Sequence, residues 1–281
     1  MKLSIITINY NNAEGLRKTL ASVSVQTYQD IEHVIVDAAS TDGSVDIIKE
    51  YAEKADYPVL WSSKKDKGIY NGMNYGIKKA IGDYIQILNS GDVLASDDVT
   101  ERMIAALNDE MSRDKSLNDG VPILYGNMIK KDYATGMLIG KSGEVEYSLR
   151  QYYASTMNHD CCYIRRDVYE RYGLYDENLK IVSDWKWFLQ TIGLGNVKPV
   201  YVDIDVTIFD CSGISEKNLE LRNRERRQVI EAVLPPAVLA DYDKHTFVTQ
   251  QMDRLRRHHL YWFVYFIERV LFKFEKWRVL R

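Results

Sequence analysis

The 281-residue sequence is poor in cysteine and proline, and no apolar run in it is long enough to span a membrane. Of its three cysteines, Cys161 and Cys162 are adjacent, and no CxxC motif occurs. This is not a disulfide framework, so the pattern favours a reducing compartment. The opening MKLSIITINY has one lysine and an apolar run too short for a signal peptide. We interpret it as a buried strand and expect a cytoplasmic protein.

The net charge is small, −3, but it is unevenly distributed. Residues 254–281 contain eight Lys or Arg side chains and two Glu, a local net charge of +6, so the preceding residues carry −9. A basic tail on an acidic body indicates an anionic partner for the tail. The body offers no basic face to nucleic acid, and we expect no nucleic-acid partner.

The first half of the chain alternates strand and helix patterns. Apolar strand patterns occupy 3–8, 33–37, 58–63 and 84–88, and helix patterns lie between them at 16–23, 44–55 and 69–81. This alternation predicts βαβ units and an α/β fold with a mainly parallel central sheet flanked by helices. In such sheets ligands bind beyond the carboxyl ends of the strands, so the segments that follow the strands are expected along one rim.

The second half is less regular. Strands are expected at 123–129, at 161–169, where the strand runs into a helix, and at 200–209. A further helix is expected to start near Ser183. After Gly213 the pattern changes to charged helices over 216–234 and 236–281. We place a boundary near Ser215, which divides the chain into a domain over 1–215 and a helical C-terminal extension over 216–281.

Four predicted rim segments carry polar groups. TINYNN (7–12) offers hydroxyl, amide and aromatic groups that suit a planar base, although helix capping by Asn is an equal alternative. VDAASTDGS (36–44) places Asp37 at a strand end, where a carboxylate accepts hydrogen bonds from a ribose or base. The segment 64–74 (KKDKGIYNGMN) has three lysines close to Gly68. These charges suit a bound phosphate, and a solvated charged loop is the alternative.

The fourth segment, ILNSGDV (87–93), ends a strand in a polar turn with one carboxylate, Asp92. Oxygen ligands in a tight turn suit a hard divalent cation that also binds a diphosphate. One carboxylate alone holds Mg²⁺ or Mn²⁺ weakly, so the phosphates would have to supply further ligands. As an isolated pattern the turn is weak evidence.

Together the segments resemble the GT-A glycosyltransferases of family 2, in particular the bacterial branch that builds capsule, exopolysaccharide or O-antigen sugars. The resemblance covers roughly residues 2–215 and is carried by SIITINYNNAEGLRKTLASVSVQTY, VIVDAASTDGS, DKGIYNGMNYGIKKAIGDYIQILNSGD, NHDCCYIRRDVY and KIVSDWKWFL. It implies a GT-A fold, with a nucleotide-sugar half over about 1–95 and an acceptor half over about 96–215.

The resemblance also implies a donor site for a nucleotide diphosphate sugar and a divalent cation, Mn²⁺ or Mg²⁺, held by Asp92. The residues it implies for donor binding are Thr7, Asn9, Tyr10, Asp37, Asp66, Lys67, Gly68, Asn89 and Ser90. The family's DXD motif falls on the turn that ends at Asp92, where Asn89 and Gly91 replace the first and middle acids. Ala38 and Asn71 are further departures, at positions where relatives often carry aspartate.

A catalytic base is expected in SDW (183–185). Inverting transfer needs a carboxylate that takes the proton of the acceptor hydroxyl. Ser183 is expected to cap a helix and Asp184 to lie in its first turn. The helix dipole there favours an ionised carboxylate, which is the form that a base must have. The alternative is that Asp184 only complements the dipole. The match to the family's acidic acceptor-side motif implies that Asp184 is the base. Trp185 is expected to stack on the acceptor sugar and His159 to support the acceptor or phosphate.

The tail LYWFVYFIERVLFKFEKWRVL (260–280) combines aromatic, aliphatic and basic residues. Its longest apolar run, 260–267, is far shorter than a membrane-spanning helix. We expect residues 254–281 to lie on an anionic membrane surface, with packing on the catalytic domain or a partner subunit as the alternative.

The sequence thus predicts an inverting, metal-dependent glycosyltransferase that acts on a saccharide or lipid-linked acceptor in bacterial surface polysaccharide synthesis. A catalytically degenerate nucleotide-sugar-binding protein is the main alternative, which Asn89, Gly91 and Ala38 favour. A Rossmann dehydrogenase is disfavoured because NYNNAEG follows the first strand in place of the GxGxxG motif that binds pyrophosphate.

Overall fold

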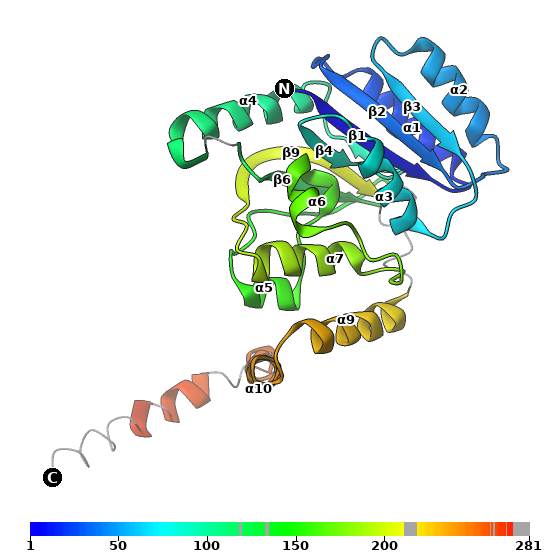
Figure 1. Ribbon diagram of the computed structural model, residues 1–281. Coiled ribbons are helices and arrows are strands. Elements are labelled where there is room, and N and C mark those ends of the chain that lie inside the picture. Colours follow the sequence, from blue (N-terminus) through cyan, green and yellow to red (C-terminus); the bar gives the residue numbers. More distant parts are fainter. Residues whose placement is uncertain are drawn as a thin grey trace. The chain divides into compact units, whose positions relative to one another are not determined.

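The computed structural model describes residues 1–117, 120–132, 135–210, 218–258, 260, 262–267 and 269–271 (Figure 1). The chain divides into two compact units, Met1–Arg227 and Gln228–Arg281. The predicted boundary near Ser215 lies outside the described residues.

The first unit contains the strands β1 (Leu3–Asn9), β2 (Ile31–Asp37), β3 (Val59–Ser63), β4 (Tyr84–Ile87), β5 (Val93–Leu94), β6 (Ile123–Lys131), β7 (Leu138–Lys141), β8 (Cys162–Arg165) and β9 (Val200–Asp210). Its helices are α1 (Ala13–Ser24), α2 (Ser44–Lys54), α3 (Ile69–Lys79), α4 (Val99–Arg113), α5 (Leu149–Ala154), α6 (Arg166–Tyr172) and α7 (Ser183–Phe188). Short helical turns are η1 (Lys115–Leu117), η2 (His159–Cys161) and the π-helical η3 (Leu189–Leu194).

The described strands form one mixed sheet of nine strands in the order β3-β2-β1-β4-β8-β6-β9-β5, with β7 paired to β6. Strands β1, β2, β3, β4, β6 and β9 point the same way, whereas β5, β7 and β8 run against them. The predicted α/β fold with a mainly parallel sheet between helices is therefore confirmed.

The alternation of buried side chains on β1 and β2 determines which helix covers which face. Ile35 packs with Leu16 and Leu20 of α1 and with α2, whereas the neighbouring Val36 lies beneath α3 together with Ile8. Successive strand residues point to opposite faces, so α1 and α2 cover one face and α3 the other (Figure 1). Fully buried strands of this kind require apolar residues on both faces, as β1 and β2 have.

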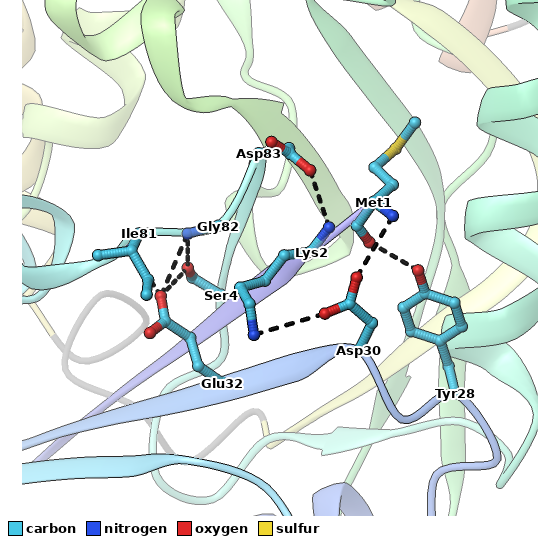
Figure 2. A network of polar contacts seen from close by, with 9 residues as sticks. All are labelled: Met1, Lys2, Ser4, Tyr28, Asp30, Glu32, Ile81, Gly82 and Asp83. Carbon is cyan, nitrogen blue, oxygen red and sulfur yellow. Dashed lines mark hydrogen bonds and ion pairs between the residues drawn. The ribbon is translucent and has the colours of Figure 1, made fainter.

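A polar network closes the edge of the sheet where β1 and β4 begin (Figure 2). The amino terminus of Met1 pairs with Asp30, and Lys2 N donates to Asp83 Oδ2 at 2.8 Å. The buried carboxylate of Glu32 accepts from Ser4 Oγ and from Ile81 N at 2.6 Å. These partners pair the polar groups at the amino ends of β1 and β4, and the predicted rim lies at the opposite, carboxyl ends of the parallel strands.

The second unit holds most of the C-terminal extension. Helix α9 (Leu219–Val233) begins in the first unit, and α10 (Pro236–Arg257) lies in the second. The prediction of one helix over 236–281 is wrong in one respect, since α10 ends at Arg257 and helix resumes over 262–267 and 269–271. Residues 272–281 lie outside the described residues. Arg254, Arg256 and Arg257 occupy the last turn, where positive charge complements the helix carboxyl terminus.

Helix α3 can approach β1 closely only because residue 76 is glycine. A Cβ at Gly76 would lie 2.4 Å from Ile6 Cγ2. We predict that Gly76→Ala lowers the free energy of unfolding by about 1 to 3 kcal/mol, as overpacking of a core does. Urea denaturation measures it, with Gly140→Ala as the control, because a Cβ at Gly140 meets nothing within 4 Å. Equal effects of the two substitutions would contradict this packing argument.

Candidate active site

Asp37 organises the rim at the ends of β1, β2 and β3. Its buried carboxylate accepts hydrogen bonds from Asn9 Nδ2 at 2.8 Å, Ser40 Oγ at 2.6 Å, Ser63 Oγ at 2.6 Å and Ser40 N at 2.9 Å. Burial on its own raises the pKa of Asp37, but these hydrogen bonds outweigh it and hold the pKa below its usual value. The carboxylate is therefore ionised and saturated by protein donors, so it positions the rim.

The two predicted donor residues beside Asn9 differ sharply in exposure. Tyr10 is 67% exposed, so its ring is open to stacking, whereas Thr7 is fully buried and its hydroxyl bonds to His33 Nε2 at 2.9 Å. Burial lowers the pKa of His33 to about 3, so this imidazole is neutral. The structure does not bring the Thr7 side chain to the rim. Asn9 is buried, and its Oδ1 has no hydrogen-bond partner among the described residues.

The loop before α3 presents its charges to solvent. Lys67 is exposed, and Asp66 Oδ1 accepts from Gly68 N at 2.9 Å. Gly68 has φ +128°, a conformation that L side chains rarely adopt, so glycine is required where this loop enters the helix. The three predicted residues thus form one turn.

The turn after β4 is fixed by α1. Thr19 Oγ1 donates to the Asp92 carbonyl at 2.7 Å and accepts from Gly91 N at 2.9 Å. Asn12 both caps α1, accepting from Gly15 N at 3.2 Å, and donates to Ser90 O at 2.9 Å. Asn12 of the TINYNN segment therefore caps α1, and its side-chain amide also fixes the backbone of the turn after β4. Gly91 has φ +112°, which explains why the middle acid of the family motif is glycine here.

The donor set of this turn fits a divalent cation only in part. Asp92 is 4% exposed, and Asn89 Oδ1 is buried with no hydrogen-bond partner among the described residues. Within the described part of the chain, no group of three or more His, Cys, Asp or Glu is arranged to hold a metal ion. One carboxylate and one amide oxygen suit Mg²⁺ or Mn²⁺ when phosphate oxygens complete the coordination.

Asp184 lies where the two halves of the first unit meet. It occupies the first turn of α7, and its Oδ1 accepts from Tyr70 OH at 2.8 Å. Its Oδ2 lies 3.4 Å from His159 Nδ1, and His159 Nε2 lies 3.1 Å from Asn89 Nδ2. A continuous polar chain therefore links Asp184 to the turn that ends at Asp92. The expected cap is wrong, since Val182 is the N-cap residue and the Ser183 hydroxyl instead accepts from Asp176 N.

The charges of His159 and Asp184 support each other. Burial lowers the pKa of His159, but the hydrogen bond and charge of Asp184 outweigh it and raise the pKa above its usual value. Burial raises the pKa of Asp184, but the hydrogen bond and charge of His159 hold it below its usual value. Neutral His159 accepts from Asn89 through Nε2, whereas protonated His159 donates through that nitrogen and requires the Asn89 amide oxygen there.

A pocket of about 900 Å³ adjoins this chain on the side of the second half. Its lining includes His159, Asp184 and Trp185, and every lining residue lies within 128–226. The volume suits a sugar-sized ligand. Trp185 is 2% exposed, its Nε1 donates to Tyr152 O at 2.7 Å, and the Arg226 guanidinium lies 4.8 Å from the ring centroid. One face of this indole is thus already occupied.

Two residues of the site were not singled out by any sequence pattern. Tyr70 lies within DKGIY, but nothing in that motif indicates that its hydroxyl reaches a residue 114 positions away. Arg226 belongs to a run of charged helical residues that is typical of a solvated face. The sequence indicates only that Arg222 and Arg226 are one helical turn apart, which predicts that their side chains lie on the same face of a helix.

Comparison with known proteins identifies the family and the fold of this chain. The sheet order and helix placement are those of the GT-A fold. The family described as "Glycosyl transferase family 2" matches residues 4–173, which is more than half of the chain. The chain belongs to this family of glycosyltransferases.

Its relatives include an uncharacterised glycosyltransferase of Mycobacterium tuberculosis, 28% identical over 215 residues, with 75% of this chain and 76% of the relative covered. A PGL/p-HBAD biosynthesis glycosyltransferase of Mycobacterium bovis is 27% identical over 210 residues, covering 75% of this chain and 77% of the relative.

Solved structures show the same fold. S. aureus TarS 1-349 in complex with UDP has a TM-score of 0.59 and 21% identity, covering 75% of this chain and 61% of TarS 1-349. The mannosyltransferase PcManGT from Pyrobaculum calidifontis, in complex with GDP-Man and Mn2+, has a TM-score of 0.58 and 17% identity, covering 80% and 60%. The chain thus spans less than two thirds of the length of these structures.

We predict that the His159 imidazole titrates above its ordinary pKa of about 6.5 and that Asp184→Asn lowers its midpoint, because the charge of Asp184 raises it. NMR titration of the imidazole measures both. The raised pKa stabilises the fold below about pH 6.5, and this contribution is lost as the pH rises through the folded-state value. His159→Gln should therefore cost more stability at acidic than at alkaline pH. A midpoint insensitive to Asp184→Asn would contradict the pairing.

Proposed function

We propose that this protein transfers a sugar, with inversion, from a nucleotide diphosphate sugar to the hydroxyl of a saccharide or lipid-linked acceptor. The observation that carries the proposal is the position of Asp184. Its carboxylate lines the large pocket and connects through His159 to Asn89 of the turn after β4. A base at this point faces both the acceptor and the reacting carbon.

The donor would bind along the rim. The exposed Tyr10 ring offers a stacking surface for the base, and the neighbouring Asn9 is held by Asp37. Lys67 and the turn of Asp66 and Gly68 lie at the entrance to α3, where cationic side chains and backbone N–H groups suit phosphate. TarS and PcManGT were solved with UDP and with GDP-Man, so structures of this fold accept nucleotide diphosphates of more than one base.

Asn89, Ser90 and Asp92 would receive the diphosphate and its cation. Asp92 and the amide oxygen of Asn89 would hold Mg²⁺ or Mn²⁺, which supplies positive charge to the departing diphosphate. Thr19 and Asn12 hold the backbone of the turn that carries these side chains.

Asp184 would act as the base. As the bond between the anomeric carbon and the diphosphate oxygen breaks, the acceptor oxygen bonds to that carbon and its proton passes to Asp184. Tyr70 and His159 orient the carboxylate and keep it ionised before the reaction. Because the acceptor attacks from the side opposite the leaving diphosphate, the transfer inverts the configuration.

The acceptor is proposed to belong to a bacterial surface glycan. The curated relative of Mycobacterium bovis is named for PGL/p-HBAD biosynthesis, which places one member of the family in such a pathway. A pocket lined by residues within 128–226 supports an acceptor half in the second part of the chain, although its lining residues Arg222 and Arg226 lie beyond the half predicted over about 96–215.

We predict that one nucleoside diphosphate stabilises the protein against heat and that EDTA abolishes most of the shift. A thermal-shift panel of UDP, GDP, dTDP and CMP, each with Mn²⁺, Mg²⁺ or EDTA, measures it. Asp92→Ala should reproduce the effect of EDTA because it removes the only carboxylate of the turn. A shift unaffected by EDTA would contradict metal-assisted binding, and no shift with any nucleotide would contradict the donor site.

We predict that Asp184→Asn slows release of nucleoside diphosphate from the cognate nucleotide sugar by about 10²- to 10⁴-fold, the contribution of a general base. Affinity for the nucleoside diphosphate should not change, because Asp184 lies on the pocket side of His159. Asp46→Asn, whose parent side chain is 85% exposed on α2, is the control. No turnover by the unaltered protein would favour the degenerate binder.

The C-terminal segment is proposed to lie on an anionic membrane surface from the cytoplasmic side. Its described apolar side chains are exposed, among them Trp262 at 75%, Phe263 at 64% and Phe266 at 66%. Arginines precede them at the end of α10. Among the described residues, no helix has the length and apolarity to cross a bilayer. Exposed aromatic residues beside basic ones suit the headgroup layer.

We predict that deletion of 254–281 abolishes co-sedimentation with phosphatidylglycerol-containing vesicles. Trp262→Ser combined with Phe266→Ser should weaken it without altering net charge, which separates apolar insertion from charge attraction. Vesicles of phosphatidylcholine alone serve as the uncharged control, because anionic lipid is required to attract the basic segment. Unchanged sedimentation of the deletion variant would contradict the proposal.

A further inference from the structure

Two arginines on the first turns of α9 line the same pocket as Asp184. Arg222 and Arg226 are one helical turn apart, so their guanidinium groups lie on one face of the helix. Both are half-buried. Burial lowers the pKa of Arg226, and the positive charge of Arg222 lowers it further. The negative charge of Asp184 raises this pKa but offsets the other two effects only in part. The pair is therefore costly unless another charge compensates it.

No carboxylate in the described part of the chain lies within ion-pair distance of either arginine. Arg226 donates to Ala154 O at 3.2 Å and covers the ring of Trp185, but its buried Nε has no hydrogen-bond partner there. Glu225, which precedes Arg226 in the sequence, is engaged elsewhere, since its carboxylate accepts from Lys180 N at 2.9 Å and Ile181 N at 3.0 Å. Two half-buried guanidinium groups that line a pocket without an ion-pair partner indicate an anionic ligand.

The position of the pair separates it from the donor rim. The lining of the pocket begins at Met128, and none of the donor residues at the ends of β1, β2 and β4 belongs to it. Asp184 lines the same pocket, with both carboxylate oxygens engaged by Tyr70 and His159. An anion bound by Arg222 and Arg226 would therefore lie on the acceptor side of Asp184.

We propose that the acceptor carries a phosphate group and that Arg222 and Arg226 bind it beside Asp184. This rests on the proposed function and specifies its acceptor. The planar fork of arginine matches phosphate oxygens with two parallel hydrogen bonds, a better fit than a neutral sugar offers. The phosphate belongs either to a lipid phosphate or to a soluble phosphorylated glycan. Exposed Leu138 and Ile139 next to Gly140 and Lys141 of the pocket lining make a lipid arm of the test informative.

The test is calorimetric titration of the full-length protein, saturated with the nucleoside diphosphate that binds the donor rim. The probes are methyl phosphate, farnesyl phosphate and uncharged farnesol. The variants are R222Q, R226K, which keeps the charge and the cover of Trp185 but loses the fork, and R224Q as an exposed arginine on the same helix. Thermal unfolding of each variant shows that it is folded.

We expect phosphate probes to bind and both R222Q and R226K to weaken them by about tenfold or more, the effect of one charged hydrogen bond. R224Q should leave binding unchanged, and no variant should alter affinity for the nucleoside diphosphate. Tighter binding of farnesyl phosphate than of methyl phosphate identifies a lipid source, and equal binding a soluble one.

The inference is overturned if phosphate probes fail to bind while the nucleoside diphosphate binds, a result that leaves the proposed function intact. Equal binding of farnesol, equal weakening by R224Q, or loss of nucleotide affinity in R222Q and R226K would also overturn it. Failure of every nucleoside diphosphate to bind the unaltered protein counts instead against the proposed function.

Discussion

The hydrogen-bonded position of the Asp184 carboxylate is the constraint on which the site depends. Tyr70 comes from α3 of the first half, His159 from the turn before β8, and Asp184 from α7. These elements meet only because β4 of the first half pairs with β8 of the second. The sheet therefore joins the donor rim to the acceptor pocket, and a polar chain through Asn89 runs across that joint.

Asp37 and Asp184 both have a lowered pKa, but their hydrogen bonds suit them to different roles. Asp37 accepts four protein hydrogen bonds and is buried, so it has no capacity left for a proton and serves to hold the rim. Asp184 accepts from Tyr70 and His159, and it faces the pocket. An ionised carboxylate with remaining acceptor sites is what deprotonation of a hydroxyl requires. The environment, more than the residue type, assigns the two roles.

The periodicity of the first half predicts β1 to β4 and α1 to α3 closely, because each is a locally amphipathic or fully apolar segment. Helix α4 went unpredicted, as did the short β5, β7 and α5, which form through contacts distant in the sequence. The contacts of Thr7 with His33 and of Tyr70 with Asp184 also join residues that are distant in the sequence, so no local pattern could predict them. The ordered motifs predicted Asp37, Asp92 and Asp184 as a set, whereas Arg222 and Arg226 resemble ordinary surface charges until the pocket is seen.

The most direct measurement is a crystal structure of the protein soaked with its nucleoside diphosphate sugar and Mn²⁺. The account predicts the base over Tyr10, the diphosphate against the turn of Asn89 to Asp92, and the anomeric carbon facing Asp184 across an otherwise empty acceptor pocket. A diphosphate bound instead to Arg222 and Arg226, or an anomeric carbon turned away from Asp184, would contradict it.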